Sequence, residues 1–256
     1  MAVRYETSGP VAVVTIDRPE VANAVDRPTA EALAEAFRRF DAADDLDVAV
    51  LTGANRTFCA GADLKAMREP GAPRASRVAP DGDGPVGPTR MLLGKPVIAA
   101  VEGHAVAGGL ELAVWCDLRV AAEDAVFGVY CRRWGIPLMD GGTIRLARLI
   151  GHSHALDLIL TGRGVHGEEA QRIGLANRLA SPGQALDVAV ALAGELASRP
   201  QAALRSDRLS SYEQWSLPLD QALKREYEHG MRALETGELF TGLDRYASGE
   251  WRAGAS

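Results

Sequence analysis

Two adjacent glycines and a glutamate, Gly108, Gly109 and Glu111, are the residues of this chain whose spacing is best suited to chemistry. They follow an apolar run, residues 96–101, that indicates a buried strand, and they open an apolar segment expected to be helical. The first N–H groups of a helix lack partners within the helix, and glycine lets a ligand oxygen approach them. A carboxyl group in the first turn can move a proton beside that oxygen. The same residues can also serve only close packing and the helix dipole.

A second stretch, FCAGADLK at residues 58–65, repeats this arrangement. Small residues lead into a short helical pattern and leave bare N–H groups near Ala62 and Asp63. Lys65 adds a cation that can meet a phosphate or lie in solvent. Two such stretches in one chain favour a ligand site over packing alone.

Strands and helices alternate around these two stretches. Strands are expected over 3–7, 11–16, 48–51, 95–101 and 118–121, and helices over 29–43, 108–116, 143–150, 154–160, 168–174, 186–197, 202–212 and 219–235. The repeated order of strand, turn and helix predicts a layered α/β repeat rather than a flat doubly wound sheet. Residues 69–89 are dense in Pro, Gly and Ala and are expected to form a mobile loop, either a lid or a tolerated insertion.

Composition excludes several classes of protein. The chain has 256 residues, with 47% hydrophobic and 24% charged residues, which is typical of a globular protein with a sizeable core. A net charge of −6 argues against a nucleic-acid partner, and no apolar run approaches the ~20 residues of a membrane span. Cys59, Cys116 and Cys131 have no metal-ligand or disulfide-framework spacing, so we expect no metal site and a cytoplasmic protein.

Several motifs in order resemble the crotonase family, the enoyl-CoA hydratase/isomerases. The resemblance is carried by residues 58–65, by AVEGHAVAGGLELAVWCD at 100–117, by DRPE at 17–20 with Asn23 and Ala24, and by LTG at 160–162 with GLA at 174–176. It implies an α/β spiral of ββα repeats over residues 1–195, and a C-terminal helical region, 196–256, that serves oligomerisation or covers the site. It also implies a homotrimer or a dimer of trimers.

The ligand implied by this resemblance is an acyl-CoA thioester, with no cofactor beyond the coenzyme A of the substrate. Its carbonyl oxygen would accept hydrogen bonds from the N–H groups of Ala62 and Gly108. Residues 60–65 would line the CoA groove, with Ala60, Asp63, Leu64 and Lys65 as binding residues and Lys65 or Arg18 facing the phosphates. Glu111 falls on the first of two family glutamates that position and activate water.

The second family glutamate is replaced in this chain by Cys131. A thiol with a pKa of ~8.5 is a poor substitute for a carboxylic acid at neutral pH. Asp140 is offset by one position from an active-site Asp of some family members, so it can be either a compensating acid or a turn residue before Gly141. Cys131 can be a small buried hydrophobe or a reactive group. Tyr130 is a further candidate, because a tyrosine serves decarboxylating members.

These residues predict an acyl-CoA-processing enzyme that stabilises a thioester enolate and uses Glu111 as the acid/base in hydration or isomerisation. The alternatives are an acyl-CoA decarboxylase, a thioester hydrolase, or an acyl-CoA-binding relative without catalysis. Pocket shape is expected to come from residues 69–89, residues 129–140 and the C-terminal helices.

Overall fold

The strands of the computed structural model form two sheets. Residues 1–68 and 72–249 are described, so residues 69–71 of the expected loop and 250–256 of the expected C-terminal region lie outside the described residues. In chain order the strands are β1 (Val3–Ser8), β2 (Val11–Ile16), β3 (Val48–Gly53), β4 (Val97–Val101), β5 (His104–Val106), β6 (Leu118–Ala122), β7 (Val126–Gly128), β8 (Gly164–His166) and β9 (Arg178–Ala180).

Helices connect and cover these strands. The α-helices are α1 (Arg27–Ala42), α2 (Leu64–Met67), α3 (Gly108–Trp115), α4 (Gly142–Thr161), α5 (Gly167–Arg172), α6 (Ala185–Ala197), α7 (Gln201–Glu213), α8 (Leu219–Glu235) and α9 (Glu238–Ala247). Short 3-10 helices occupy Pro19–Val21, Pro88–Arg90, Tyr130–Trp134 and Gln214–Ser216. The two helices expected over 143–150 and 154–160 are joined in α4, which changes direction at Gly151, where φ is 77°.

The larger sheet has the strand order β1-β2-β3-β4-β6-β9. β1 and β2 form the expected antiparallel hairpin, and the later neighbours pair in parallel. β4 is buried throughout because helices cover both faces of the sheet, which explains its unbroken apolar sequence. Along β3, Ala49 and Leu51 belong to the core that includes α1 and α3, whereas Val48 and Val50 pack against α6.

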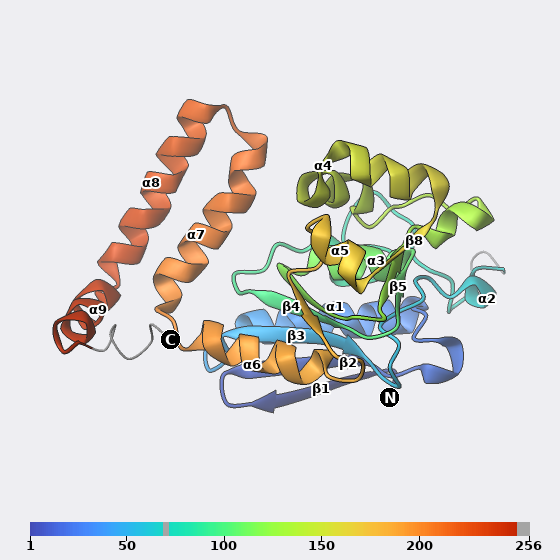
Figure 1. Cartoon of the computed structure of the whole chain (residues 1–256), viewed down its shortest axis with the longest axis horizontal. Helices are drawn as coiled ribbons and strands as arrows, with labels where there is room; N and C mark the ends of the chain where they lie inside the picture. Colours follow the sequence, from blue (N-terminus) through green and yellow to red (C-terminus); the bar gives the residue numbers. More distant parts are fainter. Residues whose placement is uncertain (69–71, 250–256) are drawn as a thin grey trace.

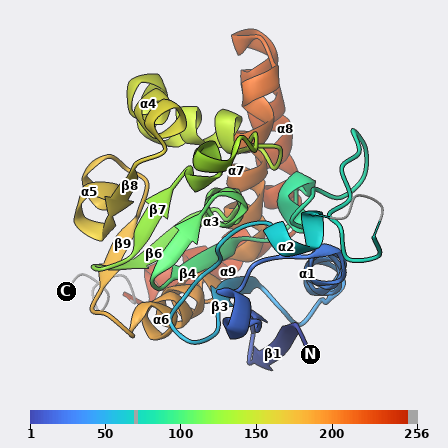
Figure 2. The same cartoon turned by 90° about the vertical axis from the view of Figure 1, so that its right-hand side faces the viewer.

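The smaller sheet, β5-β7-β8, completes a spiral. β5 pairs with β7 in parallel, with Ala105 opposite Phe127, and an isolated bridge sets Cys59 opposite Ala105. The order strand, second-sheet partner and helix recurs as β3–Cys59–α2, β4–β5–α3 and β6–β7–α4. The expected spiral of ββα repeats is therefore confirmed, and Figure 2 shows the strands of successive turns side by side.

The C-terminal region is helical, as expected. α7 and α8 form a hairpin of two long helices at one end of the molecule, and α9 follows α8 (Figure 1). Arg205 of α7 pairs with Asp47 at 2.6 Å, and Arg208 pairs with Asp117 at 2.7 Å, which attaches the hairpin to the region of the sheet. Within the described ranges, no helix combines the length and the apolar character that a membrane crossing needs.

Candidate active site

The spiral brings the ends of three turns together. Ala105 of β5 lies between Cys59, with which it forms an isolated bridge, and its partner Phe127 of β7. Three residues after these in the chain come Ala62, Gly108 and Tyr130. Neighbouring strands of a sheet lie about 4.8 Å apart, so these positions converge although they are far apart in the sequence. A Cβ added at Gly108 would lie 3.5 Å from the Ala62 nitrogen. The two glycine-containing stretches thus meet at one place.

Main-chain N–H groups at this place are left without partners. The Gly61 carbonyl accepts a hydrogen bond from the Val25 N–H at 2.7 Å, and because the peptide bond is trans, the Ala62 N–H of that peptide points away from Val25. Gly108 is the first residue of α3, so its N–H has no acceptor within the helix. Neither N–H donates to another described residue, and both residues line the same pocket. Two main-chain N–H donors of pocket-lining residues therefore remain without acceptors among the described residues.

Gly108 and Gly109 play different roles. A Cβ at Gly109 would lie 2.1 Å from the Cys59 carbonyl oxygen, so this glycine allows α3 to pack directly on the preceding turn of the spiral. A Cβ at Gly108 would lie 2.9 Å from Cγ1 of Val86, on the wall of the pocket. Close packing therefore explains Gly109, whereas Gly108 keeps space free on the pocket side of the helix.

Glu111 lies in the first turn of α3, and its side chain is only 3% exposed. Its Oε1 accepts two main-chain hydrogen bonds, from the Asp140 N–H at 2.8 Å and the Gly142 N–H at 2.9 Å. Burial, reinforced by the negative charge of Asp140, raises the pKa of Glu111 to about 7. A carboxyl group with this pKa can both accept and release a proton near neutral pH.

Asp140 lies directly beside Glu111. It precedes the N-terminus of α4, as a turn residue would, but its side chain is 4% exposed and lines the pocket. Its Oδ1 accepts hydrogen bonds from the Val86 N–H at 3.2 Å and from the Thr89 hydroxyl. Burial raises the pKa of Asp140 above its ordinary value. The pocket therefore contains two carboxyl groups of raised pKa.

Cys131 and Tyr130 also line this pocket. Cys131 is buried, and burial together with the negative charge of Glu111 raises the pKa of its thiol, so it stays neutral at pH 7. Arg133 stacks on the ring of Tyr130 at 3.8 Å, and Arg132 donates to the Ile159 carbonyl. Neither arginine lowers the pKa of the thiol below its ordinary value. Among the described residues, no group of three or more His, Cys, Asp or Glu side chains is arranged to hold a metal.

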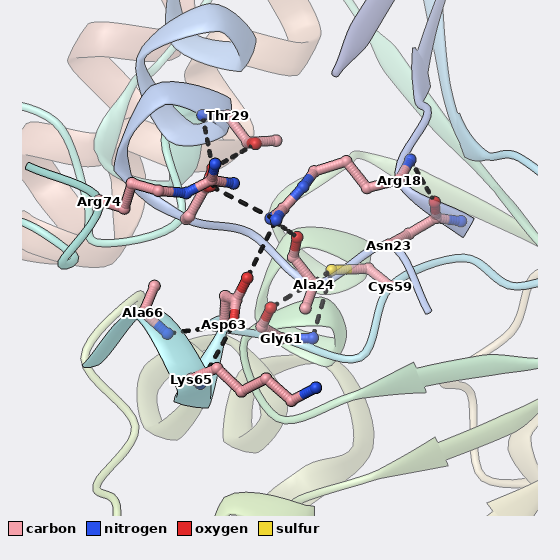
Figure 3. Close-up of polar contacts among 11 residues, drawn as sticks. Arg18, Asn23, Ala24, Thr29, Cys59, Gly61, Asp63, Lys65, Ala66 and Arg74 are labelled. Carbon is pink, nitrogen blue, oxygen red and sulfur yellow. Dashed lines mark hydrogen bonds and ion pairs between the residues drawn. The ribbon is translucent and has the colours of Figure 1, made fainter. Parts of the chain in front are cut away.

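The residues expected to bind CoA divide into two groups. Ala60 and Leu64 line the pocket, whereas Asp63 and Lys65 do not. The Asp63 carboxylate accepts hydrogen bonds from two N–H groups of α2 and pairs with Arg18 at 3.0 Å. Lys65 is exposed, and its side chain extends away from Asp63 and Arg18 (Figure 3). The expectation that Arg18 faces the phosphates is wrong, because its guanidinium is buried between carboxylates.

Apolar side chains form most of the remaining pocket wall, which encloses a volume of about 110 Å³. Residues 72–89 supply Ser76, Val78, Pro85 and Val86, and residues 129–140 supply Trp134, Ile136, Pro137 and Met139. The contribution of both segments is as expected, but in the described chain the C-terminal helices contribute nothing to this pocket. Residues 84–89, expected to belong to a mobile loop, are buried.

Comparison with known proteins agrees with this geometry. The sequence model of the enoyl-CoA hydratase/isomerase family matches residues 6–249. Enoyl-CoA hydratase EchA19 of Mycobacterium tuberculosis is 34% identical over 253 residues, which cover 94% of this chain and 92% of that protein. (E)-benzylidenesuccinyl-CoA hydratase of Thauera aromatica is 36% identical over 87% of each chain.

Solved structures of enoyl-CoA hydratases are also similar to this chain. The crystal structure of enoyl-CoA hydratase EchA1 from Mycobacterium marinum superposes with a TM-score of 0.90 and 36% identity over 96% of each chain. An enoyl-CoA hydratase from Mycobacterium tuberculosis superposes with a TM-score of 0.91, at the same identity and coverage. The chain therefore belongs to the enoyl-CoA hydratase/isomerase family, the crotonases, and is an acyl-CoA-processing enzyme of that type.

Proposed function

We propose that this enzyme catalyses the reversible hydration of a 2-enoyl-CoA thioester, with Glu111 as the acid/base. The observation that supports this most directly is the set of groups on one pocket: two N–H donors without acceptors, at Ala62 and Gly108, next to a carboxyl group with a pKa of about 7. The relatives named above are hydratases, which supports the same reaction.

In this proposal the thioester carbonyl oxygen accepts hydrogen bonds from the N–H groups of Ala62 and Gly108. Negative charge develops on that oxygen when a nucleophile adds to the enoyl double bond. Donors fixed in position stabilise the charged transition state more than the neutral substrate. Loss of one such donor typically lowers the rate by ~10²–10³.

Glu111 takes a proton from water as the water oxygen bonds to C3, and the electrons of the double bond move onto the carbonyl oxygen. Because the two N–H groups hold Oε1 of Glu111, Oε2 is the oxygen available to the water. A proton then adds to C2 and restores the thioester. We assign this proton to Asp140, which lines the pocket beside Glu111 and whose pKa is raised by burial. The proton that Glu111 took from water then passes to Asp140, which restores both carboxyl groups for the next turnover. Asp140 would thus replace the acid that is missing at Cys131.

Coenzyme A would enter along Ala60 and Leu64, which line the pocket, with Lys65 in solvent near the phosphates. A direct contact of Asp63 with CoA is harder to support, since its carboxylate already binds Arg18 and α2. This chemistry needs no cofactor other than the coenzyme A of the substrate. All three cysteines of the chain are free thiols, which supports a cytoplasmic enzyme.

We also propose a homotrimer or a dimer of trimers, with residues 1–195 as the core and 196–256 as the oligomerisation region. Support comes from the apolar side chains that α8 and α9 leave exposed, among them Leu223, Tyr227, Leu234 and Phe240. Exposed apolar faces of this kind mark association surfaces. Analytical ultracentrifugation of the full chain tests this assembly, and a monomer at micromolar concentration would contradict it.

Decarboxylation of an acyl-CoA is the second candidate. It needs the two N–H donors and one proton donor but no second carboxyl group. It is favoured by Tyr130, whose side chain lines the pocket where a proton could be delivered, and by the neutral thiol of Cys131 at the position of the missing acid.

The test is the loss of the enoyl absorbance of crotonyl-CoA, compared between the wild type and Glu111→Gln. We expect decay in the wild type and none in the variant, with affinity for crotonyl-CoA changed only a few fold. A wild type that binds crotonyl-CoA without consuming it would refute hydration. Decarboxylation and thioester hydrolysis would then be assayed with malonyl-type and saturated acyl-CoA, and binding without any turnover would indicate a relative that has lost catalysis. Full activity of Glu111→Gln would remove Glu111 from the mechanism.

A further inference from the structure

A buried ionic cluster that includes Asp63, the residue after Ala62, lies outside the pocket. It consists of Arg18, Asp26 and Asp63, with Arg74 at its outer edge. Figure 3 shows Arg18, Asp63 and Arg74 together. The first three residues are 7%, 1% and 7% exposed, so they are shielded from solvent. None of them lines the pocket, and the proposed reaction makes no use of their charges.

One guanidinium, that of Arg18, binds three acceptors in this cluster. Arg18 Nη2 lies 3.0 Å from Oδ2 of Asp63 and 3.4 Å from Oδ2 of Asp26, and Nη1 donates to the Ala24 carbonyl at 2.5 Å. The planar, multiply donating guanidinium suits this task better than an ammonium group. Arg74 also binds Asp26, but its side chain is 62% exposed and it makes no bond to Asp63.

Each carboxylate of the cluster also fixes the start of a helix. Asp26 accepts hydrogen bonds from the N–H and hydroxyl of Thr29 and so caps α1. Asp63 accepts from the N–H groups of Lys65 and Ala66 and caps α2. Arg18 therefore sets the position of α2 relative to α1 by holding both capping residues.

Ala62 lies immediately before this second cap, and its orientation depends on its neighbours. The Val25 N–H donates to Gly61 O at 2.7 Å, and the Asp63 N–H donates to Val25 O at 2.9 Å. These two bonds hold the peptides on both sides of Ala62 against the segment that Arg18 also holds through Ala24. The direction of the Ala62 N–H is thus fixed by main-chain bonds to Val25 and by the Arg18–Asp63 ion pair.

We infer that Arg18 is a positioning residue for the reaction, acting through Asp63 on the direction of the Ala62 N–H. This inference rests on the proposed function, in which that N–H binds the thioester oxygen. Loss of Arg18 leaves the Asp63 carboxylate buried without its cationic partner, which favours movement of the cap and of the peptide before it. Catalysis is sensitive to donor geometry, whereas CoA binding along Ala60 and Leu64 is not affected to the same degree.

The test compares Arg18→Met with Arg74→Met, a matched control that removes the other guanidinium of the cluster without touching Asp63. For Arg18→Met we expect kcat with crotonyl-CoA to fall at least ~10-fold, towards the ~10²–10³ of a lost donor, with little change in KM. Arg74→Met should keep both constants close to wild type. Arg18→Lys should recover part of the lost kcat, since its ammonium can hold Asp63 but not all three acceptors.

A spectroscopic readout separates positioning from a general loss of structure. Cinnamoyl-CoA labelled with carbon-13 at the thioester carbonyl is bound to Glu111→Gln enzyme, where turnover is blocked, and its C=O stretch is recorded by infrared difference. Hydrogen bonds to the carbonyl oxygen lower this frequency. Adding Arg18→Met should return the frequency part of the way to that of free cinnamoyl-CoA, and adding Arg74→Met should not.

The outcomes are distinct. If Arg18→Met and Arg74→Met give the same frequency and the same kcat, Arg18 has only a structural role and the inference is overturned. If Glu111→Gln enzyme itself does not lower the frequency, the proposed donors are wrong and the inference falls with them. If Arg18→Met does not fold, Asp63→Asn decides, because Asn keeps an Oδ1 to cap α2 and loses the ion pair. It should shift the frequency in the same direction, and an unchanged frequency would overturn the inference.

Discussion

Replacing Glu111 with Gln should stabilise the folded protein, and the gain should grow with pH. In the folded protein, burial and the neighbouring Asp140 raise the pKa of Glu111 from 4.5 to about 7. Between these two values the folded state binds more protons at this group than the unfolded state does, so wild-type stability falls as pH rises. Gln keeps an Oε1 acceptor for the two N–H groups of residues 140 and 142 and carries no charge to be buried.

The magnitude follows from the two pKa values. Each tenfold change in proton affinity corresponds to about 1.4 kcal/mol, so the ionised carboxylate destabilises the folded state by about 3 kcal/mol at pH 8. At pH 5 most of the folded protein is protonated at Glu111, and the same linkage leaves about 1 kcal/mol. For a chain of this size, the difference at pH 8 corresponds to a rise in Tm of roughly 6–12 °C.

Urea denaturation of the wild type and Glu111→Gln at pH 5 and pH 8 measures both values. Glu102→Gln is the control, since Glu102 is also buried but both of its oxygens accept main-chain bonds, from Gly183 and Ala185. That variant should lose stability at both pH values. If Glu111→Gln gains nothing, or gains equally at pH 5 and pH 8, then burial does not raise the pKa of Glu111 and the reasoning about its proton transfer fails.

Two further predictions follow from the same site. Gly109→Ala should lower the free energy of unfolding by ~1–3 kcal/mol, because the new Cβ would lie 2.1 Å from the Cys59 carbonyl oxygen. The control Gly194→Ala lies on helix α6 with no atom within 4 Å of the new Cβ and should not lower it. Equal effects of the two variants in urea titrations would contradict the packing argument. Asp140→Asn should lower kcat/KM, because it removes the proposed proton donor. The midpoint of the remaining pH profile should move below about 7, because the charge that helps to raise the pKa of Glu111 is removed; an unchanged midpoint would show that the two groups are not coupled.

Much of the fold was predictable because its signals are local. The helix from Leu219 to Glu235 and the hairpin at the N-terminus follow from hydrophobic periodicity, and Gly108 marks the start of α3. β5, β7, β8 and β9 were not predicted as strands, since three residues are too few for an alternating pattern to show. The resemblance to a known family supplied the spiral that these short strands complete.

The surroundings of the site could not be predicted from single positions. Glu111 meets Asp140 because the N-terminus of α4 folds back on α3, a contact between residues far apart in the sequence. In the same way, Val86 and Thr89 reach Asp140 from a segment whose composition indicates only a loop. Arg18 was one of two residues expected to face the phosphates, because nothing in the sequence shows that Asp26 and Asp63 enclose it. Such contacts depend on tertiary packing.

The two proposed donors are main-chain atoms, and this has a consequence for how the enzyme can vary. Alanine scanning of the pocket would leave the N–H groups of Ala62 and Gly108 in place, since every residue except proline carries one. Side chains such as Trp134 and Met139 can therefore be exchanged to admit a different acyl group while the donors persist. A proline substitution, or an edit of the backbone itself such as an ester in place of the amide at Gly108, would delete a donor. In such a site the side chains determine which acyl group binds, and the main chain binds the thioester carbonyl. Acyl-group specificity can therefore be redesigned without changing the hydrogen bonds to the carbonyl.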